Sequence, residues 1–139
     1  MESGRASLEF LVAGVVLFIP TLLVAVSLWT IQQAALATDA AARHGVRTLA
    51  QATSPSGALE RTESAVGAAM SAFGIDTDYS LSLQCQPQGA CLTPGAWLEL
   101  TVTANVELGA IPLIPASLPM RVPIAGTAHA QVSDYRGVP

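Results

Sequence analysis

The sequence predicts an α+β protein in which a long N-terminal transmembrane and stem helix and a second short helix pack on a three-stranded antiparallel sheet. An uncharged, mostly apolar run extends from Phe10 to Ile31, and alanine-rich helical periodicity continues to about Ala52. From Tyr79 the apolar period falls from about 3.6 residues to 2, as in strands. We therefore expect a transmembrane segment at residues 5–31, a helical stem at 32–53 and a small α+β head at 54–139.

The apolar run is long enough to cross a bilayer. Its 22 residues would form about 33 Å of helix, which matches a hydrocarbon core of roughly 30 Å. Pro20 lies within the run, but proline is tolerated in membrane helices.

A glycine and a glutamate stand at the N-terminal end of this run. A cut after Gly4 would expose a new amine on Arg5, about one helical turn from the Glu9 carboxylate. A carboxylate at the bilayer centre costs roughly 2.5 to 3.5 kcal/mol, and less near the interface, so it needs a partner. The simpler alternative is an interfacial glutamate that the helix dipole favours by a few tenths of a kcal/mol. The spacing resembles a class III, type IV pilin-like signal. That resemblance implies a prepilin leader at residues 1–4, cleavage after Gly4 by a prepilin peptidase, and pairing of Glu9 with the N-terminal amine of a neighbouring subunit.

An ordinary secretory signal peptide is the main alternative. Ala35-Leu36-Ala37 could be its small-residue cleavage site, with Thr38 as the mature start. Such a signal has a basic n-region and a shorter apolar stretch. The first nine residues instead hold Glu2 and Glu9 against one arginine, and the apolar run is too long.

Composition limits the remaining possibilities. Outside the membrane, the 139-residue chain suffices for one small domain. Only 12% of its residues are charged, lysine is absent and the net charge is -4, so no basic patch exists for nucleic acid. Arg43 and Arg47 follow the span and Arg5 precedes it, which by the positive-inside rule places the C-terminal side in the cytoplasm. A pilin-like signal implies the opposite orientation.

The stem continues the membrane helix, so that one helix is expected from about Ser7 to Ala52. Small residues recur every four positions along it and allow close helix packing. We expect this stripe both to pack on the chain's own head and to contact another helix. Asp39 and Arg43 form an i, i+4 ion pair in the favourable order. The stripe is Ala37, Ala41 and Gly45.

A second helix is expected from about Pro55 to Phe73, docked on the core as a surface helix. Ser54 can cap it, Pro55 suits its first position and Gly74 can end it. Its expected apolar stripe is Leu59, Val66, Met70 and Phe73.

Three alternating segments predict strands with one apolar face each, as in an antiparallel sheet laid on a helix. Pro123 suits an edge strand or a bulge. The proline-rich residues 109–119 connect the last two strands. They are too apolar for an ordinary exposed loop, so we expect them to fold back on the head or to contact another subunit. The apolar positions are Tyr79, Leu81, Leu83 and Cys85; Leu98, Leu100, Val102, Ala104, Val106 and Leu108; and Met120, Val122, Ile124, Ala128, Ala130 and Val132.

The two cysteines, Cys85 and Cys91, flank a five-residue stretch between the first two strands. We expect a disulfide, which indicates an oxidising compartment and therefore a head outside the cytoplasm. Two thiols are half of a structural zinc site, and the histidines, His44 and His129, lie on a helix and on a polar strand face. No catalytic motif is visible, so we expect neither an enzyme nor a cofactor.

These features together resemble a TadE-like minor pseudopilin of the tight-adherence (Tad/Flp) pilus. Glu9-Phe10 fits the family's glutamate followed by an aromatic residue, and the stem and the disulfide-containing head match in architecture. Arg5 departs from the phenylalanine that opens ordinary type IV pilins. The resemblance implies a single-pass protein of the bacterial cytoplasmic membrane with its head outside, which joins an extracellular pilus. Its implied partners are a prepilin peptidase, other pilus subunits, the Tad assembly machinery and membrane lipid.

Two alternatives to a processed pseudopilin stay open. One is an unprocessed, single-span binding module in which Glu9 is dispensable. The other is a small secreted domain cut after Ala37.

Overall fold

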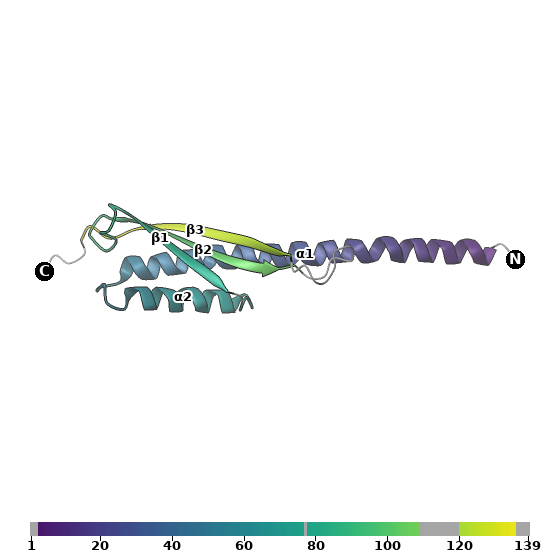
Figure 1. The fold of residues 1–139 in the computed structure, drawn as a ribbon, viewed down its shortest axis with the longest axis horizontal. Coiled ribbons are helices and arrows are strands. Elements are labelled where there is room, and N and C mark those ends of the chain that lie inside the picture. Colours follow the sequence, from purple (N-terminus) through teal and green to yellow (C-terminus); the bar gives the residue numbers. More distant parts are fainter. Residues whose placement is uncertain (1–2, 77, 109–119, 136–139) are drawn as a thin grey trace.

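The computed structural model describes residues 3–76, 78–108 and 120–135, and it has the predicted α+β architecture (Figure 1). Two helices lie on one side of a three-stranded antiparallel sheet. The first helix continues far beyond the sheet toward the N-terminus. The elements are α1 (Ser3–Gln51), α2 (Ala58–Ala72), β1 (Tyr79–Gln86), β2 (Trp97–Glu107) and β3 (Arg121–Gln131).

Helix α1 is one uninterrupted helix of 49 residues, about 74 Å long at 1.5 Å per residue. It begins four residues earlier than expected and passes through Pro20 without a break. Residues 6–22 are exposed throughout, whereas side chains from Ala34 onward alternate between buried and exposed. The N-terminal half therefore projects from the head, and the C-terminal half belongs to the head's core (Figure 1).

Helix α2 begins three residues later than predicted. The Ser54 hydroxyl donates to the carbonyl of Ser56 rather than capping the helix, and Gly57 takes the N-cap position at φ 75°. The predicted cap at Ser54 and first position at Pro55 were therefore wrong, because the chain makes a further turn through a left-handed glycine before it enters the helix.

The C-terminal end of α2 confirms the predicted stop at Gly74. This residue adopts φ 69°. Its N–H donates to the Ser71 carbonyl at 2.9 Å, and the N–H of Ile75 donates to the Met70 carbonyl at 3.2 Å. This pair of bonds is a Schellman motif, in which glycine supplies the left-handed residue.

The buried face of α2 differs from the predicted stripe. Leu59 is 56% exposed and Phe73 is 38% exposed. The helix packs closely on α1, so small side chains occupy part of the interface, and the Thr62 hydroxyl is satisfied by donating to the Ala58 carbonyl at 2.8 Å. The buried residues are Ala58, Thr62, Val66 and Met70.

The sheet has the order β1-β2-β3, with β2 in the centre. Alternate residues of β2 are buried against the helices, as its period of two predicted. Pro123 is in β3 and lies opposite Asn105 of β2. Because β3 is an edge strand, the prediction that Pro123 lies in an edge strand is confirmed. The predicted connection at 109–119 lies outside the described residues. The buried β2 residues are Leu98, Leu100, Val102, Ala104 and Val106.

Glycines let the helices and the sheet approach closely. A β carbon at Gly45 of α1 would lie 2.5 Å from Leu100 Cδ2 and 2.7 Å from Val66 Cγ2. A β carbon at Gly126 of β3 would overlap the α1 backbone at Thr38 and Asp39. At Gly126 the sheet therefore touches the stem backbone directly, with no side chain between them.

Replacing Gly126 by alanine is expected to lower the free energy of unfolding by about 1 to 3 kcal/mol, because the new methyl group forces β3 away from α1. Denaturant unfolding of the full chain in detergent, followed by circular dichroism, measures this loss. Gly14→Ala is the matched control, since nothing lies within 4 Å of its β carbon position. Equal stability of the two variants would contradict the close contact.

Candidate functional site

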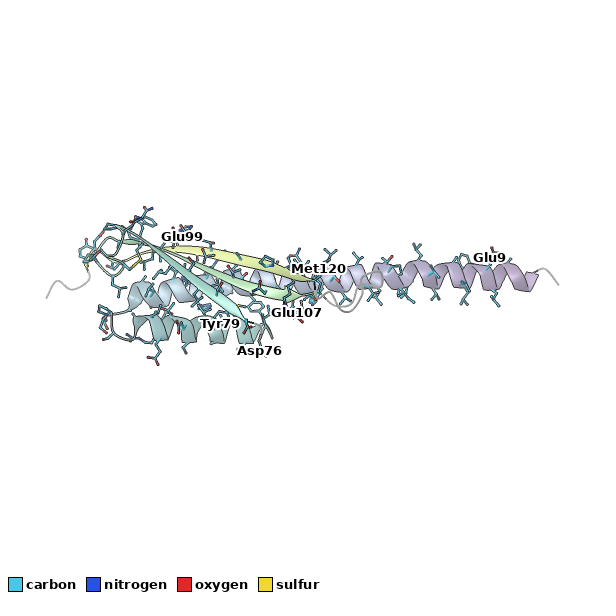
Figure 2. All side chains as sticks on the ribbon, in the orientation of Figure 1. Glu9, Asp76, Tyr79, Glu99, Glu107 and Met120 are labelled. Carbon is cyan, nitrogen blue, oxygen red and sulfur yellow. A yellow bond between two sulfur atoms is a disulfide. The ribbon has the colours of Figure 1, made fainter. Side chains whose placement is uncertain are left out.

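The predicted processing and assembly residues lie at the far N-terminal end of α1. Gly4 and Arg5 belong to the helix, which begins at Ser3. Glu9 lies near the N-terminal end of the exposed apolar segment and far from the head (Figure 2). Phe10, beside it, is 82% exposed. The structure thus presents this end of the helix to the surroundings and not to the rest of the chain.

The Glu9 carboxylate makes no hydrogen bond or ion pair with any other side chain among the described residues after Arg5. The helix around it is long and apolar enough to cross a membrane, and none of its most apolar stretch is buried within the chain. Pairing of this carboxylate with a cation of another subunit therefore stays a prediction.

The small-residue stripe of the stem faces the head. Ala37 and Ala41 are 0% exposed and Gly45 is buried, so these residues hold α1 against α2 and the sheet. The predicted packing of this stripe on the chain's own head is therefore confirmed. Contact with another helix stays a prediction, and the exposed side of the stem that could provide it carries Gln32, Leu36, Arg43, His44 and Arg47.

Charged side chains on the head form exposed pairs. Arg43 Nη2 lies 2.8 Å from Asp39 Oδ2, which confirms the predicted i, i+4 ion pair. A further ion pair, Glu107 with Arg121 at 2.7 Å, crosses from β2 to β3 on the outer face of the sheet. On the same face, Glu99 Oε2 lies 3.6 Å from His129 Nδ1. Exposed pairs of this kind contribute about 0 to 1 kcal/mol each, so they orient side chains more than they stabilise the fold.

The disulfide joins Cys85 at the end of β1 to Cys91, as predicted. Their α carbons are 5.1 Å apart. The connection between β1 and β2 lies at the end of the head opposite the N-terminus (Figure 1). Backbone bonds from Ala90 N–H to Pro87 and from Thr93 N–H to Ala90 complete the loop. The bridge therefore fixes the end of the head that is farthest from the apolar helix.

A groove of about 590 Å³ at the opposite end of the head was not predicted. It lies where α1 leaves the head, and Trp29, Phe73 and Val106 supply apolar walls. Asp76, Asp78 and the Glu107–Arg121 pair add charge. These segments are distant in sequence, so only the tertiary structure brings them together. The sequence signal for this groove was Trp29, an aromatic residue near the C-terminal end of the apolar run, where membrane helices often carry tryptophan.

Among the described parts of the chain, no three His, Cys, Asp or Glu side chains are grouped so that they could hold a metal ion. The described histidines lie apart, His44 on α1 and His129 on β3. A scan against protein-family models, a search of curated proteins and a search of solved structures each found no match to this chain.

Replacing both cysteines by serine is expected to lower the free energy of unfolding by about 2 kcal/mol, the chain-entropy contribution of so short a loop. Chemical denaturation of the oxidised protein and of the double variant measures the difference. Reduced wild-type protein should match the variant. If oxidised and reduced wild-type proteins unfold at the same denaturant concentration, the disulfide does not stabilise the head.

Proposed function

We propose that this chain is a structural minor pseudopilin of a Tad-type pilus, processed by a prepilin peptidase after Gly4 and contributing to pilus assembly and adhesion. The observation that carries the proposal is the Glu9 carboxylate, which has no partner among the described side chains and lies near the N-terminal end of the exposed apolar segment of α1. Cleavage after Gly4 would create an ammonium on Arg5 of each copy. The ammonium of one copy can then pair with Glu9 of its neighbour.

The exposed apolar helix supports a membrane location. No described part of the chain covers residues 6–22, and leaving so many large apolar side chains in water would be strongly unfavourable. A bilayer covers them before assembly, and the corresponding helices of other subunits can cover them in a filament. Within a shielded environment the Glu9 charge also favours an ionic partner more strongly than in water.

The structure's packing counts against the secreted alternative. A cut after Ala37 would fall inside α1, where Ala37 and Thr38 are 0% exposed. The backbone of Thr38 lies against Gly126 of β3. Removal of residues 1–37 would also expose the part of the core that Ala34 covers, so the head would lose packing it uses in the intact chain.

The disulfide supports a head outside the cytoplasm, because such bonds persist in oxidising compartments. The arginines that favoured the opposite orientation lie on the stem beside the folded head. Arg43 is paired with Asp39, and both arginines are in the half of α1 that packs on the sheet. For this reason we give the disulfide more weight than the positions of the arginines when we assign the orientation of the chain.

A processed pseudopilin requires Glu9 for assembly, whereas an unprocessed binding module does not. We expect Glu9→Gln and Glu9→Ala each to reduce incorporation into pili at least about tenfold. Breaking a charge pair shielded from water costs about 3 to 5 kcal/mol, and 1.4 kcal/mol already corresponds to a factor of ten. Immunoblotting of sheared pili and of membranes, from cells that carry the complete pilus machinery, measures the ratio.

Glu60→Ala is the matched control, since Glu60 is also an exposed helical glutamate but lies on α2. It should leave incorporation unchanged, and all variants should reach the membrane in equal amounts. Normal incorporation of Glu9→Gln would contradict the pairing and favour the anchored binding module.

A further inference from the structure

The outer face of the sheet carries an exposed tryptophan at the end of the head farthest from the apolar helix. Trp97 is the first residue of β2 and is 55% exposed. The register places Gln86 of β1 on one side of it and Gln131 of β3 on the other. An exposed aromatic ring is thus bordered by two uncharged amide side chains.

The next row of the same face is polar as well. Glu99, two residues along β2, lies between Gln84 and His129. Figure 2 shows Glu99 near the end of the head opposite Glu9, on the side of the sheet away from α1. Five members of the two rows, Gln84, Gln86, Trp97, Glu99 and His129, line a shallow recess of about 170 Å³ together with Leu98, and Gln131 borders Trp97 outside that lining. We call these residues the distal platform: Gln84, Gln86, Trp97, Glu99, His129 and Gln131.

The polar groups of the distal platform are oriented but retain hydrogen-bonding capacity. The Gln131 amide donates to the Gly95 carbonyl at 3.3 Å, which leaves its own carbonyl oxygen free to accept. The Glu99 carboxylate lies 3.6 Å from His129 Nδ1. Neither Gln84 nor Gln86 makes a side-chain hydrogen bond to a described residue. Donors and acceptors for a ligand therefore surround the ring.

We propose that the distal platform binds a neutral saccharide. The C–H face of a sugar ring is apolar and stacks on an aromatic plane, while its hydroxyl groups both donate and accept hydrogen bonds, as amides and carboxylates require. The platform's one acidic group disfavours an anionic ligand, and the exposed amides suit an uncharged one. The recess is below the roughly 300 to 1,000 Å³ of enclosed ligand pockets, which fits one sugar unit of a longer chain lying on the surface.

No other described row of the outer face combines an aromatic ring with amide side chains on both sides of it. The central row of this face pairs Thr101 with Thr127 through a hydroxyl–hydroxyl hydrogen bond of 3.0 Å. The row at the other end is the Glu107–Arg121 ion pair, in which the two charges satisfy each other. Aromatic stacking and free amides coincide at the distal end, where the fold holds them farthest from the apolar helix. Saccharide binding there does not depend on cleavage after Gly4 or on pilus assembly.

The test uses the full chain in detergent micelles and four neutral probes: the tetramer of N-acetylglucosamine, cellotetraose, maltotetraose and mannotetraose. Saturation-transfer NMR and calorimetric titration should reveal at least one probe that binds with a Kd of about 1 mM or tighter. Trp97→Ala should weaken that binding about tenfold or more, and Trp97→Phe should retain part of it because the ring remains.

Two matched controls separate the platform from general effects. Trp29→Ala removes the same side chain from α1, and Glu107→Gln removes an exposed carboxylate that is also paired across to β3. Both should bind as the wild type does, whereas Glu99→Gln should bind more weakly. The proposal is overturned if none of the four probes binds at about 10 mM, or if binding survives in Trp97→Ala. Loss of pilus association in Trp97→Ala, without saccharide binding by the wild type, would identify a protein-docking surface instead.

Discussion

Strand β3 and helix α1 meet backbone to backbone at Gly126, and the rest of the molecule depends on this contact. Because no side chain separates them, the sheet lies directly on the stem at Thr38 and Asp39. One and a half to two turns further along α1, Gly45 lets the side chains of Val66 in α2 and Leu100 in β2 lie against the stem. The stem is therefore part of the head's core, and the head cannot fold around a different helix without losing these contacts.

This constraint links the two ends of the molecule. The same helix that fills the core continues, without a break at Pro20, into the exposed apolar segment that bears Glu9. Any partner that fixes the N-terminal half in a bilayer or a filament thus also fixes the direction of the head. The connection between β1 and β2 lies at the end of the head farthest from the apolar segment (Figure 1), and the distal platform lies at the same end of the strands.

The features that depend on local periodicity and spacing could be predicted from the sequence. The fold class, the strands and the Cys85–Cys91 bridge followed from spacings within short segments, and the structure has them. The start of α2 was wrong because Gly57 adds a turn that no hydrophobic pattern reveals. Leu59 and Phe73 were placed in its buried stripe because large apolar residues were favoured over Ala58 and Thr62, although close helix packing selects small ones.

The candidate sites divide in the same way. Gly4 and Glu9 are five residues apart, so a processing and pairing motif could be predicted from one short segment. The distal platform combines three strands, and its rows exist only once the register of β1, β2 and β3 is known. The groove beside Trp29 likewise joins four segments that no local pattern connects.

The most direct test of this account is the N-terminal residue and intact mass of the protein recovered from membranes of cells with the matching prepilin peptidase. The account predicts a chain that begins at Arg5, keeps the whole of the membrane and stem helix after the leader, and lacks two hydrogens because of the disulfide. A start at Thr38 would contradict the shared helix, because it removes the span and cuts α1 within the core. A start at Met1 despite active peptidase would contradict the processed pseudopilin.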